Sequence, residues 1–300
     1  MAEETARANG IEIAYETNGD PSNPPLLLVM GLGMQLIHWD TELCEQLAER
    51  GFYVIRFDNR DSGHSTKIDA PVPDVRRAMM GLSVDAPYLL EDMADDAFGL
   101  LEALGIDAAH VVGASMGGMI AQTMAIKLPE RVLSLTSIMS TTGERRAGRP
   151  KLRVWGVLMR RAPEEKQAYI ERFVRIFRLI GSKGFPLQDE RIRELAAATY
   201  ERGHHAAGTG RQLAAILASG DRTAQLRSVQ VPATVIHGRS DPLVPFRGGR
   251  ATARAIPDAR LIAIPGMGHD LPREVWPQLV DAVAENARRA APARAAPQPR

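Results

Sequence analysis

The segment from residue 109 to residue 128 constrains the fold of this chain more than any other. It starts as a short apolar run, passes through a Gly-x-Ser-x-Gly sequence at 113–117, and continues with apolar residues at helical spacing. This order predicts a strand, a sharp turn and a helix, with Ser115 at the apex of the turn. The two glycines have no Cβ atom, so the turn can close tightly and the serine backbone can take strained dihedral angles. Ser115 is therefore the first candidate for a nucleophile.

Further apolar runs predict strands that alternate with helices along most of the chain. The Asn9-Gly10 pair predicts a hairpin turn before an alternating strand at 11–16. The other predicted strands are 26–30, 52–57, 109–113, 132–139, 231–236 and 261–264. The predicted helices are 39–50, 89–104, 116–128 and one that starts near residue 274. This alternation predicts an α/β fold in which a mostly parallel sheet carries helices on both faces.

The alternation lapses at residues 141–226, which are predicted to be helical. The clearest helical stretches are 164–180 and 189–200. We interpret the segment as a cap inserted over the carboxyl ends of the strands, where open α/β sheets bind ligands. Residues 1–140 and 227–289 then form the core, and the Ala-, Pro- and Arg-rich residues 290–300 form a disordered tail.

The predicted cap is basic, although the whole chain is nearly neutral. The basic residues of the cap include Arg145, Arg146, Arg149, Arg153, Arg160 and Arg161. An ordinary solvated helix face explains these arginines better than an anion site does. Over the whole chain, 37 Lys and Arg against 36 Asp and Glu leave a net charge of +1. This balance gives no electrostatic basis for binding nucleic acid or a membrane surface.

Composition and the N-terminus indicate a cytoplasmic globular protein. Of the 300 residues, 45% are hydrophobic and 24% are charged, as in ordinary globular domains. The single cysteine, Cys44, excludes an internal disulfide, suits a reducing compartment and is expected to be a core residue of the helix at 39–50. The acidic N-terminus lacks the apolar stretch of a signal peptide, and the longest apolar runs are too short to span a bilayer.

A serine nucleophile needs a general base, and the base needs an acid that orients it. His269 follows the predicted strand 261–264 on a glycine-rich loop, and Asp241 follows the predicted strand 231–236. Ser115 also comes directly after a strand, so the carboxyl edge of a parallel sheet would bring all three side chains together. We expect Ser115 to be the nucleophile, His269 the base and Asp241 the acid.

The other histidines are weaker candidates for the base. His110 and His237 lie inside predicted strands, where a structural role is expected, whereas His38 and His64 lie in loops that could border the site. The neighbouring pair His204-His205 has no further ligands at metal-binding spacing. No metal site is therefore expected.

The negative charge that develops on the substrate oxygen needs two backbone N–H donors, which form an oxyanion hole. The N–H of Met116, the residue after the nucleophile, is one candidate because it lies at the start of a helix, where the helix dipole helps. The N–H of Leu32 is the other, because Gly31 and Gly33 let the chain turn inward after the strand at 26–30.

At these residues the chain resembles α/β-hydrolase-fold serine hydrolases, in which serine, acid and histidine follow one another in this order. The resemblance covers nearly the whole chain except the tail. Its motifs lie at 29–33, 56–65, 111–118, 240–242 and 264–269. In particular, the chain resembles the bacterial esterase subgroup that includes aclacinomycin methylesterase, although Leu32 stands where that enzyme has glycine. The resemblance implies an eight-stranded sheet, a helical cap and ester hydrolysis.

Other classes of protein fit the sequence less well. Gly31-x-Gly33 followed by Asp58 imitates a dinucleotide-binding motif, but Leu36 stands where the third glycine belongs. A non-catalytic ligand receptor on the same fold is a second alternative, which a complete set of serine, acid and histidine disfavours. Among serine-dependent enzymes, carbon–carbon bond hydrolases, perhydrolases and thioesterases remain alternatives.

The sequence therefore predicts a cofactor-free carboxylesterase that cleaves a small-molecule ester through an acyl-enzyme. Several methionines lie near the predicted strand ends, namely Met30, Met34, Met116, Met119 and Met139. Because methionine is an adaptable apolar side chain, these residues favour a substrate with an apolar acyl or alcohol part. Core packing explains most of them equally well.

Overall fold

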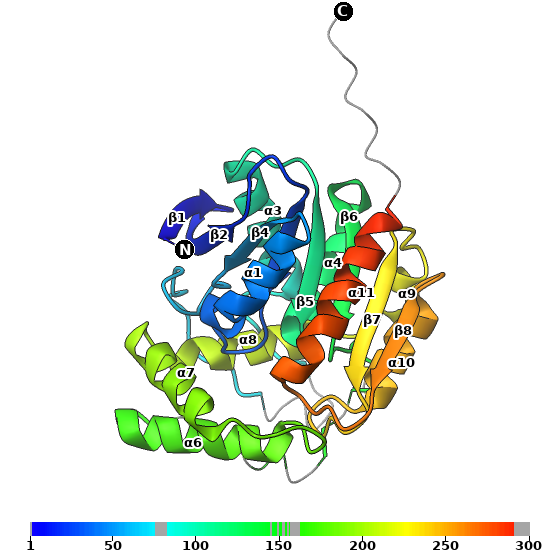
Figure 1. Ribbon diagram of the computed structural model, residues 1–300. Coiled ribbons are helices and arrows are strands. Elements are labelled where there is room, and N and C mark those ends of the chain that lie inside the picture. The colour runs from blue at the N-terminus through cyan, green and yellow to red at the C-terminus, as the bar shows by residue number, and fades with distance from the viewer. Residues whose placement is uncertain are drawn as a thin grey trace, which may run out of the picture.

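An eight-stranded sheet forms the centre of the computed structural model (Figure 1). The structure describes residues 2–290 except 76–82, 145, 149, 152, 153, 155 and 157–162. The strands are β1 (Glu3–Ala8), β2 (Ile11–Asn18), β3 (Pro25–Val29), β4 (Tyr53–Phe57), β5 (Ala109–Ala114), β6 (Val132–Ile138), β7 (Ala233–Gly238) and β8 (Arg260–Ile264). Their order across the sheet is β1-β2-β4-β3-β5-β6-β7-β8, with β2 antiparallel to both of its neighbours and all other pairs parallel. The expected mostly parallel sheet of eight strands is confirmed.

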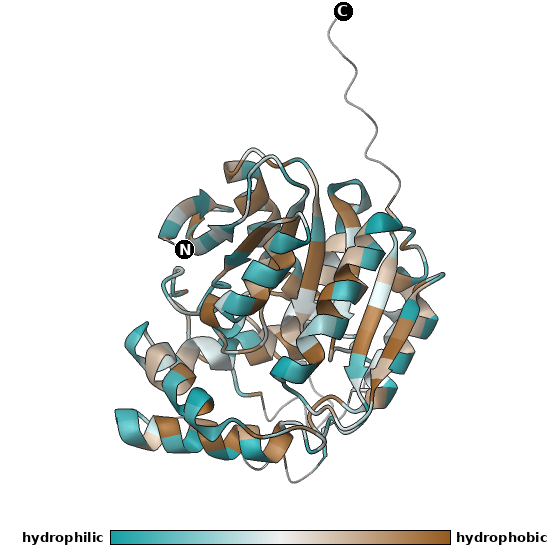
Figure 2. Ribbon diagram, viewed as in Figure 1, coloured by the Kyte–Doolittle hydropathy of each residue, from teal (hydrophilic) through white to brown (hydrophobic). Residues whose placement is uncertain are grey.

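Helices cover both faces of the sheet, as predicted (Figure 1). On one face lie α1 (Thr41–Glu49) and α11 (Trp276–Arg288), and on the other lie α3 (Leu90–Ala103), α4 (Met116–Lys127) and α10 (Phe246–Ala255). Neighbouring side chains of a strand point to opposite faces. In β3, Leu26 and Leu28 therefore join the apolar cluster of α1 and α11, whereas Leu27 and Val29 join that of α3 and α4. Figure 2 shows hydrophobic residues along the strands and hydrophilic residues on the outward sides of the helices.

The ends of the predicted elements differ from the structure by a few residues, for local reasons. The helix predicted at 39–50 begins at Thr41, because the Asp40 side chain accepts a hydrogen bond from the Glu42 N–H (3.0 Å) and caps the helix. The predicted hairpin turn is present between β1 and β2. Asn9 (φ 48°) and Gly10 (φ 81°) both take positive φ, as a type I′ turn requires.

The described part of the chain between β6 and β7 consists of helices joined by loops and turns and contains no strand. Its helices are α6 (Lys166–Ile180), α7 (Asp189–Glu201), α8 (Ala206–Ser219) and α9 (Thr223–Leu226). Figure 1 shows α6, α7 and α8 beyond the end of the sheet toward which the parallel strands point. The division into a core at 1–140 and 227–289 and a cap at 141–226 stays a prediction.

Some predicted features fall outside the described residues. They are residues 291–300 of the predicted tail and the basic side chains Arg145, Arg149, Arg153, Arg160 and Arg161. Cys44, by contrast, is fully buried in α1, as expected. In the part of the chain that the structure describes, no helix has the length and apolarity needed to cross a membrane.

Candidate active site

Ser115 lies in the sharp turn between β5 and α4. Its backbone has φ 56° and ψ −118°, a conformation that costs a non-glycine residue about 1–3 kcal/mol. Two glycines allow the turn to form. A Cβ atom at Gly113 would lie 2.1 Å from the Gly117 carbonyl oxygen, and one at Gly117 would lie 2.0 Å from the Val29 carbonyl oxygen. The turn therefore packs directly against β3, with the serine at the carboxyl edge of the sheet.

Hydrogen bonds hold the Ser115 backbone in this strained turn. Its N–H donates to the Ile138 carbonyl oxygen at the end of β6 (2.9 Å). Its carbonyl oxygen accepts from Ser140 Oγ (2.7 Å) and from the Gly118 N–H (3.0 Å). These bonds fix the Ser115 backbone and therefore the direction in which its hydroxyl points away from the sheet.

The Ser115 hydroxyl, the His269 ring and the Asp241 carboxylate form a chain of hydrogen bonds. Ser115 Oγ lies 2.9 Å from His269 Nε2, and His269 Nδ1 lies 2.7 Å from Asp241 Oδ2. An ionised carboxylate only accepts, so Nδ1 carries the ring proton and Nε2 is left to accept from the serine. His269 and Asp241 are 8% and 3% exposed, whereas Ser115 is partly exposed. The structure thus brings together the three residues that the sequence singled out.

The surroundings of Asp241 keep its carboxyl group charged. Burial raises the pKa of Asp241, but the interactions with His269 and His237 outweigh burial and hold this pKa below its ordinary value. The second carboxylate oxygen, Oδ1, accepts from the N–H groups of Leu243 (2.8 Å) and Val244 (2.9 Å). Asp241 is therefore an anion at neutral pH, and it can orient the His269 ring.

His237, for which a structural role was expected, lies beside the same carboxylate. Its Nε2 donates to the Val244 carbonyl oxygen (2.8 Å) and lies 3.6 Å from Asp241 Oδ2. The ring is fully buried, and its Nδ1 has no hydrogen-bond partner among the described residues. Sequence reasoning missed the contact with Asp241, because a spacing of four residues indicates a contact on a helix, whereas His237 lies in β7 and Asp241 in the turn after it.

The predicted oxyanion-hole residues Met116 and Leu32 lie on the two segments that meet at Ser115. Met116 is the first residue of α4, so its N–H points out of the helix N-terminus. Leu32 follows Gly31, at which a Cβ atom would lie 3.1 Å from Ser115 Cβ. Within the described residues, neither the Leu32 N–H nor the Met116 N–H donates to an acceptor of the protein. Both N–H groups are available to a negatively charged oxygen.

The loop that carries Leu32 is held by a side chain from far along the chain. Gln212 of α8 accepts from the Gly33 N–H through Oε1 (2.8 Å) and donates from Nε2 to the Arg60 carbonyl oxygen (2.8 Å). Gln212 is fully buried. Sequence reasoning did not find this residue, because 179 positions separate it from Gly33 and no local pattern marks it.

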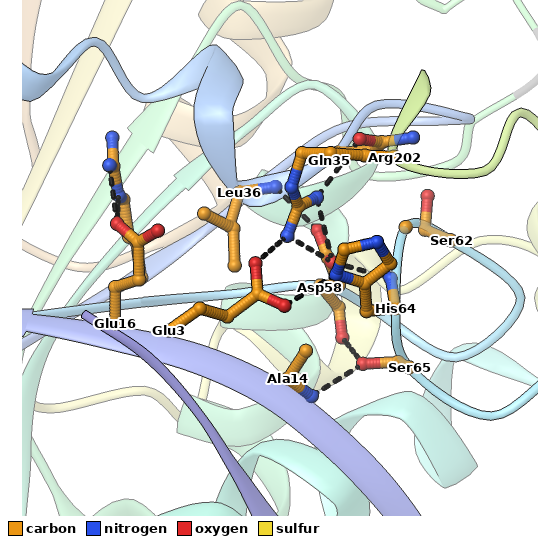
Figure 3. Close-up of polar contacts among 12 residues, drawn as sticks. Glu3, Ala14, Glu16, Gln35, Leu36, Asp58, Ser62, His64, Ser65 and Arg202 are labelled. Atoms are coloured by element: carbon orange, nitrogen blue, oxygen red, sulfur yellow. Dashed lines mark hydrogen bonds and ion pairs between the residues drawn. The ribbon is translucent and has the colours of Figure 1, made fainter. Parts of the chain in front are cut away.

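A polar cluster lies at the end of the same loop, around Gln35 and Leu36 (Figure 3). The buried Asp58 carboxylate accepts from the N–H groups of Leu36 (2.6 Å) and His64 (2.9 Å) and from both terminal nitrogens of Arg202 (3.1 Å each). Arg202, at the end of α7, also pairs with Glu3, which contacts the His64 ring. The Asp58 oxygens are thus bonded within this chain, which argues against a role in binding a dinucleotide.

The remaining histidines that the sequence analysis considered make contacts of their own. His38, one of the two loop histidines considered for the border of the site, faces Phe173 of α6, with 5.9 Å between the ring centroids. The His64 ring pairs with Glu3, as the cluster above shows. Among the described residues, no group of three or more His, Cys, Asp or Glu side chains could hold a metal ion.

Comparison with known proteins agrees with this fold. The model of the alpha/beta hydrolase fold family matches residues 24–272, and the chain belongs to that family. It is similar to the enol-lactonase from Burkholderia xenovorans LB400, with a TM-score of 0.74 and 21% identity over 95% of this chain and 100% of that one, which shows the fold.

Two curated relatives are similar over most of their length. The chain is 31% identical to rhodomycin D methylesterase DauP of Streptomyces sp. (strain C5), over 91% of this chain and 93% of the relative. It is 32% identical to rhodomycin D methylesterase DnrP of Streptomyces peucetius, with the same coverage. The expected resemblance to a methylesterase subgroup is confirmed, and the comparisons support a carboxylic ester hydrolase.

Proposed function

We propose that this protein hydrolyses carboxylic esters through an acyl-enzyme formed on Ser115. The observation that carries the proposal is the hydrogen-bonded chain from Asp241 through His269 to Ser115, with distances of 2.7 and 2.9 Å. The similarity to two methylesterases supports ester hydrolysis. This chemistry uses only side chains and backbone groups of the protein, so it needs no cofactor.

The proposed reaction assigns one role to each group. His269 Nε2 accepts the hydroxyl proton as Ser115 Oγ attacks the ester carbonyl carbon, and Asp241 stabilises the resulting imidazolium. The N–H groups of Leu32 and Met116 donate to the carbonyl oxygen as it becomes negative. His269 then gives its proton to the leaving alcohol. Water repeats the same two steps on the acyl-enzyme, which releases the acid and restores Ser115.

The proposed substrate is a small-molecule ester with an apolar part. An apolar cluster on α6 and α7, formed by Tyr169, Ile170, Phe173 and Ala196, packs against Met34, two residues after Leu32. If residues 141–226 form a cap, the cap turns apolar surface toward the predicted oxyanion loop. Because the two relatives are named as methylesterases, a methyl ester is the first substrate class to test.

The test compares wild-type protein with Ser115→Ala. Hydrolysis of p-nitrophenyl esters of increasing acyl length and release of methanol from methyl esters are measured for both proteins. Ser115→Ala is expected to lose turnover on every ester while its circular dichroism and melting temperature stay those of the wild type. Full activity in Ser115→Ala would contradict the mechanism, and the preferred acyl length would measure the size of the pocket.

The alternatives predict other outcomes in the same assays. A folded wild-type protein that hydrolyses no ester but cleaves a thioester, forms a peracid or cleaves a carbon–carbon bond would belong to the corresponding class of serine-dependent enzymes. Ligand binding without any turnover would indicate a receptor on this fold.

A further inference from the structure

The end of α6 and the turn after it, residues 180–184, lie against the loop 266–270 that carries His269 (Figure 1). The His269 N–H donates to the last carbonyl oxygen of α6 (2.8 Å). In the opposite direction, the N–H groups of Lys183 and Gly184 donate to the first carbonyl oxygen of the loop, at 3.0 Å each. Backbone hydrogen bonds in both directions therefore join the two segments.

Ser182 lies at the centre of this contact. Its Oγ accepts from the Gly268 N–H (2.9 Å) and donates to Asp270 Oδ1 (2.5 Å), and its own N–H donates to the same oxygen (2.9 Å). Ser182 thus binds the residue before His269 and the residue after it. Because Ser182 is only 6% exposed, water hardly competes for these bonds.

The two segments also touch backbone to backbone. A Cβ atom at Gly268 would lie 2.4 Å from the backbone of Gly181, and one at Gly184 would lie 2.7 Å from Gly266 Cα. This close packing prevents the histidine loop from moving toward the turn. The hydrogen bonds of Ser182 oppose movement away from it.

The position of the loop matters because the His269 ring makes two hydrogen bonds at once. Its Nε2 lies 2.9 Å from Ser115 Oγ, and its Nδ1 lies 2.7 Å from Asp241 Oδ2. The loop contains Gly268 and also Gly266, at φ 76°, so without support it would have access to many conformations. A displacement of about 1 Å in a catalytic group can lower a rate by about 100-fold.

We propose that Ser182 is a positioning residue that, through Gly268 and Asp270, holds His269 in place for proton transfer from Ser115. The proposal rests on the proposed function, because it concerns the base of that reaction. It makes the end of α6, within the predicted cap, a support of the catalytic geometry.

Ser182→Ala removes both side-chain hydrogen bonds and is expected to lower kcat by up to about 100-fold, with KM unchanged. Ser219→Ala is the matched control. Ser219 Oγ also accepts a backbone N–H, from Leu90 (2.9 Å), and donates to an acceptor, the Ala215 carbonyl oxygen (2.7 Å). It does so at a different contact between residues 141–226 and the core, so Ser219→Ala is expected to keep its kcat.

Substitutions of Asp270 test the same proposal independently, and they remain informative if Ser182→Ala fails to fold. Asp270→Asn keeps an acceptor oxygen for Ser182 and is expected to keep kcat close to wild type. Asp270→Ala removes the acceptor and is expected to match Ser182→Ala. The reaction of Ser115 with a p-nitrophenyl phosphonate needs His269 as the base but involves no deacylation. The rate of this labelling is therefore expected to fall in the same proportion as kcat.

The outcomes separate this inference from the proposed function. Unchanged kcat and labelling in Ser182→Ala and Asp270→Ala would overturn the inference, and so would an equal loss in Ser219→Ala. If kcat falls as much in Asp270→Asn as in Asp270→Ala, the effect comes from the charge of Asp270 and not from its hydrogen bonds to Ser182. That result would also overturn the inference. Failure of the proposed function is distinct, because the wild-type protein would then neither hydrolyse esters nor react at Ser115.

Discussion

At the scale of single residues, the site depends on the charge state of Asp241. A buried carboxylate is stable only where enough hydrogen-bond donors face it. His269 Nδ1 and the N–H groups of Leu243 and Val244 supply three donors, at 2.7, 2.8 and 2.9 Å. Both oxygens of Asp241 therefore accept hydrogen bonds. Because Oδ2 accepts from the His269 ring, the ring carries its proton on Nδ1.

Asp241→Asn is expected to lower kcat by about 10,000-fold, because an amide can offer an N–H to Nδ1 and so favour the wrong ring tautomer. The shape of the side chain is nearly unchanged, so the fold is expected to persist. Asp221→Asn is the control, because Asp221 is exposed and accepts from the Thr223 N–H (2.9 Å). The measurement is the steady-state kcat of both variants on one ester. Equal kcat values for the two variants would contradict the role of Asp241.

At the scale of elements, α8 supports the turn that follows β3. The Met34 N–H donates to the Gly31 carbonyl oxygen (3.2 Å), and Gly33 has φ 67°. A turn with positive φ at its third residue is of type II, in which the central peptide is flipped relative to type I. The Gly33 N–H belongs to that peptide and donates to Gln212 Oε1 (2.8 Å). Helix α8 thus holds the turn that carries the Leu32 N–H.

Gln212→Met keeps the side-chain volume but removes the acceptor of the Gly33 N–H. It is expected to lower kcat by up to about 100-fold, the low end of the cost of losing one oxyanion donor. The affinity for a trifluoromethyl ketone, which forms a negatively charged adduct on a serine, is expected to fall with kcat.

Gln122→Met is the matched control for this substitution. Gln122 of α4 is also fully buried, but its Nε2 donates to Ser137 Oγ (3.1 Å) and not to the turn after β3. Gln122→Met is expected to lower the melting temperature while ketone affinity stays at the wild-type value. Equal losses of affinity in the two variants would point to general destabilisation instead of positioning.

At the scale of the whole molecule, a buried histidine makes stability depend on pH. His110 in β5 is 6% exposed, and burial lowers its pKa from 6.5 to about 4. Between these values the unfolded chain binds a proton that the folded protein does not. The free energy of unfolding therefore decreases as the pH falls from about 6.5 to about 4. This shift corresponds to roughly 3 kcal/mol for one histidine.

His110→Asn removes this titration, because asparagine binds no proton in that range. Urea unfolding from about pH 7 to about pH 4 is expected to show a smaller loss of stability in His110→Asn than in the wild type, by up to about 3 kcal/mol. Loss of the contact between His110 Nδ1 and Ser134 Oγ (2.8 Å) lowers stability at every pH. The quantity to compare is therefore the slope of the free energy of unfolding against pH. Identical slopes in the two proteins would contradict the assignment.

Local patterns in the sequence were enough to predict most of the strands and the residues that meet at the sheet edge, although they did not predict α8 or α10. Short apolar runs predict the strands, and the glycines predict the turn at Ser115. Asp241 and His269 were found because each lies in a loop directly after a predicted strand. The ends of elements were less predictable, because a single side chain such as Asp40 decides where a helix begins.

The sequence by itself therefore determined the α/β fold class and was enough to name the candidate residues Ser115, Asp241 and His269, since both follow from residue types and their local order. Only the tertiary structure decided which neighbours hold the loops around those residues. The contacts that do so are Gly33–Gln212, Asp58–Arg202 and Ser182–Asp270, which span 179, 144 and 88 positions. A polar side chain carries no local sign of a partner so distant, because its contacts depend on how α6, α7 and α8 pack over the sheet.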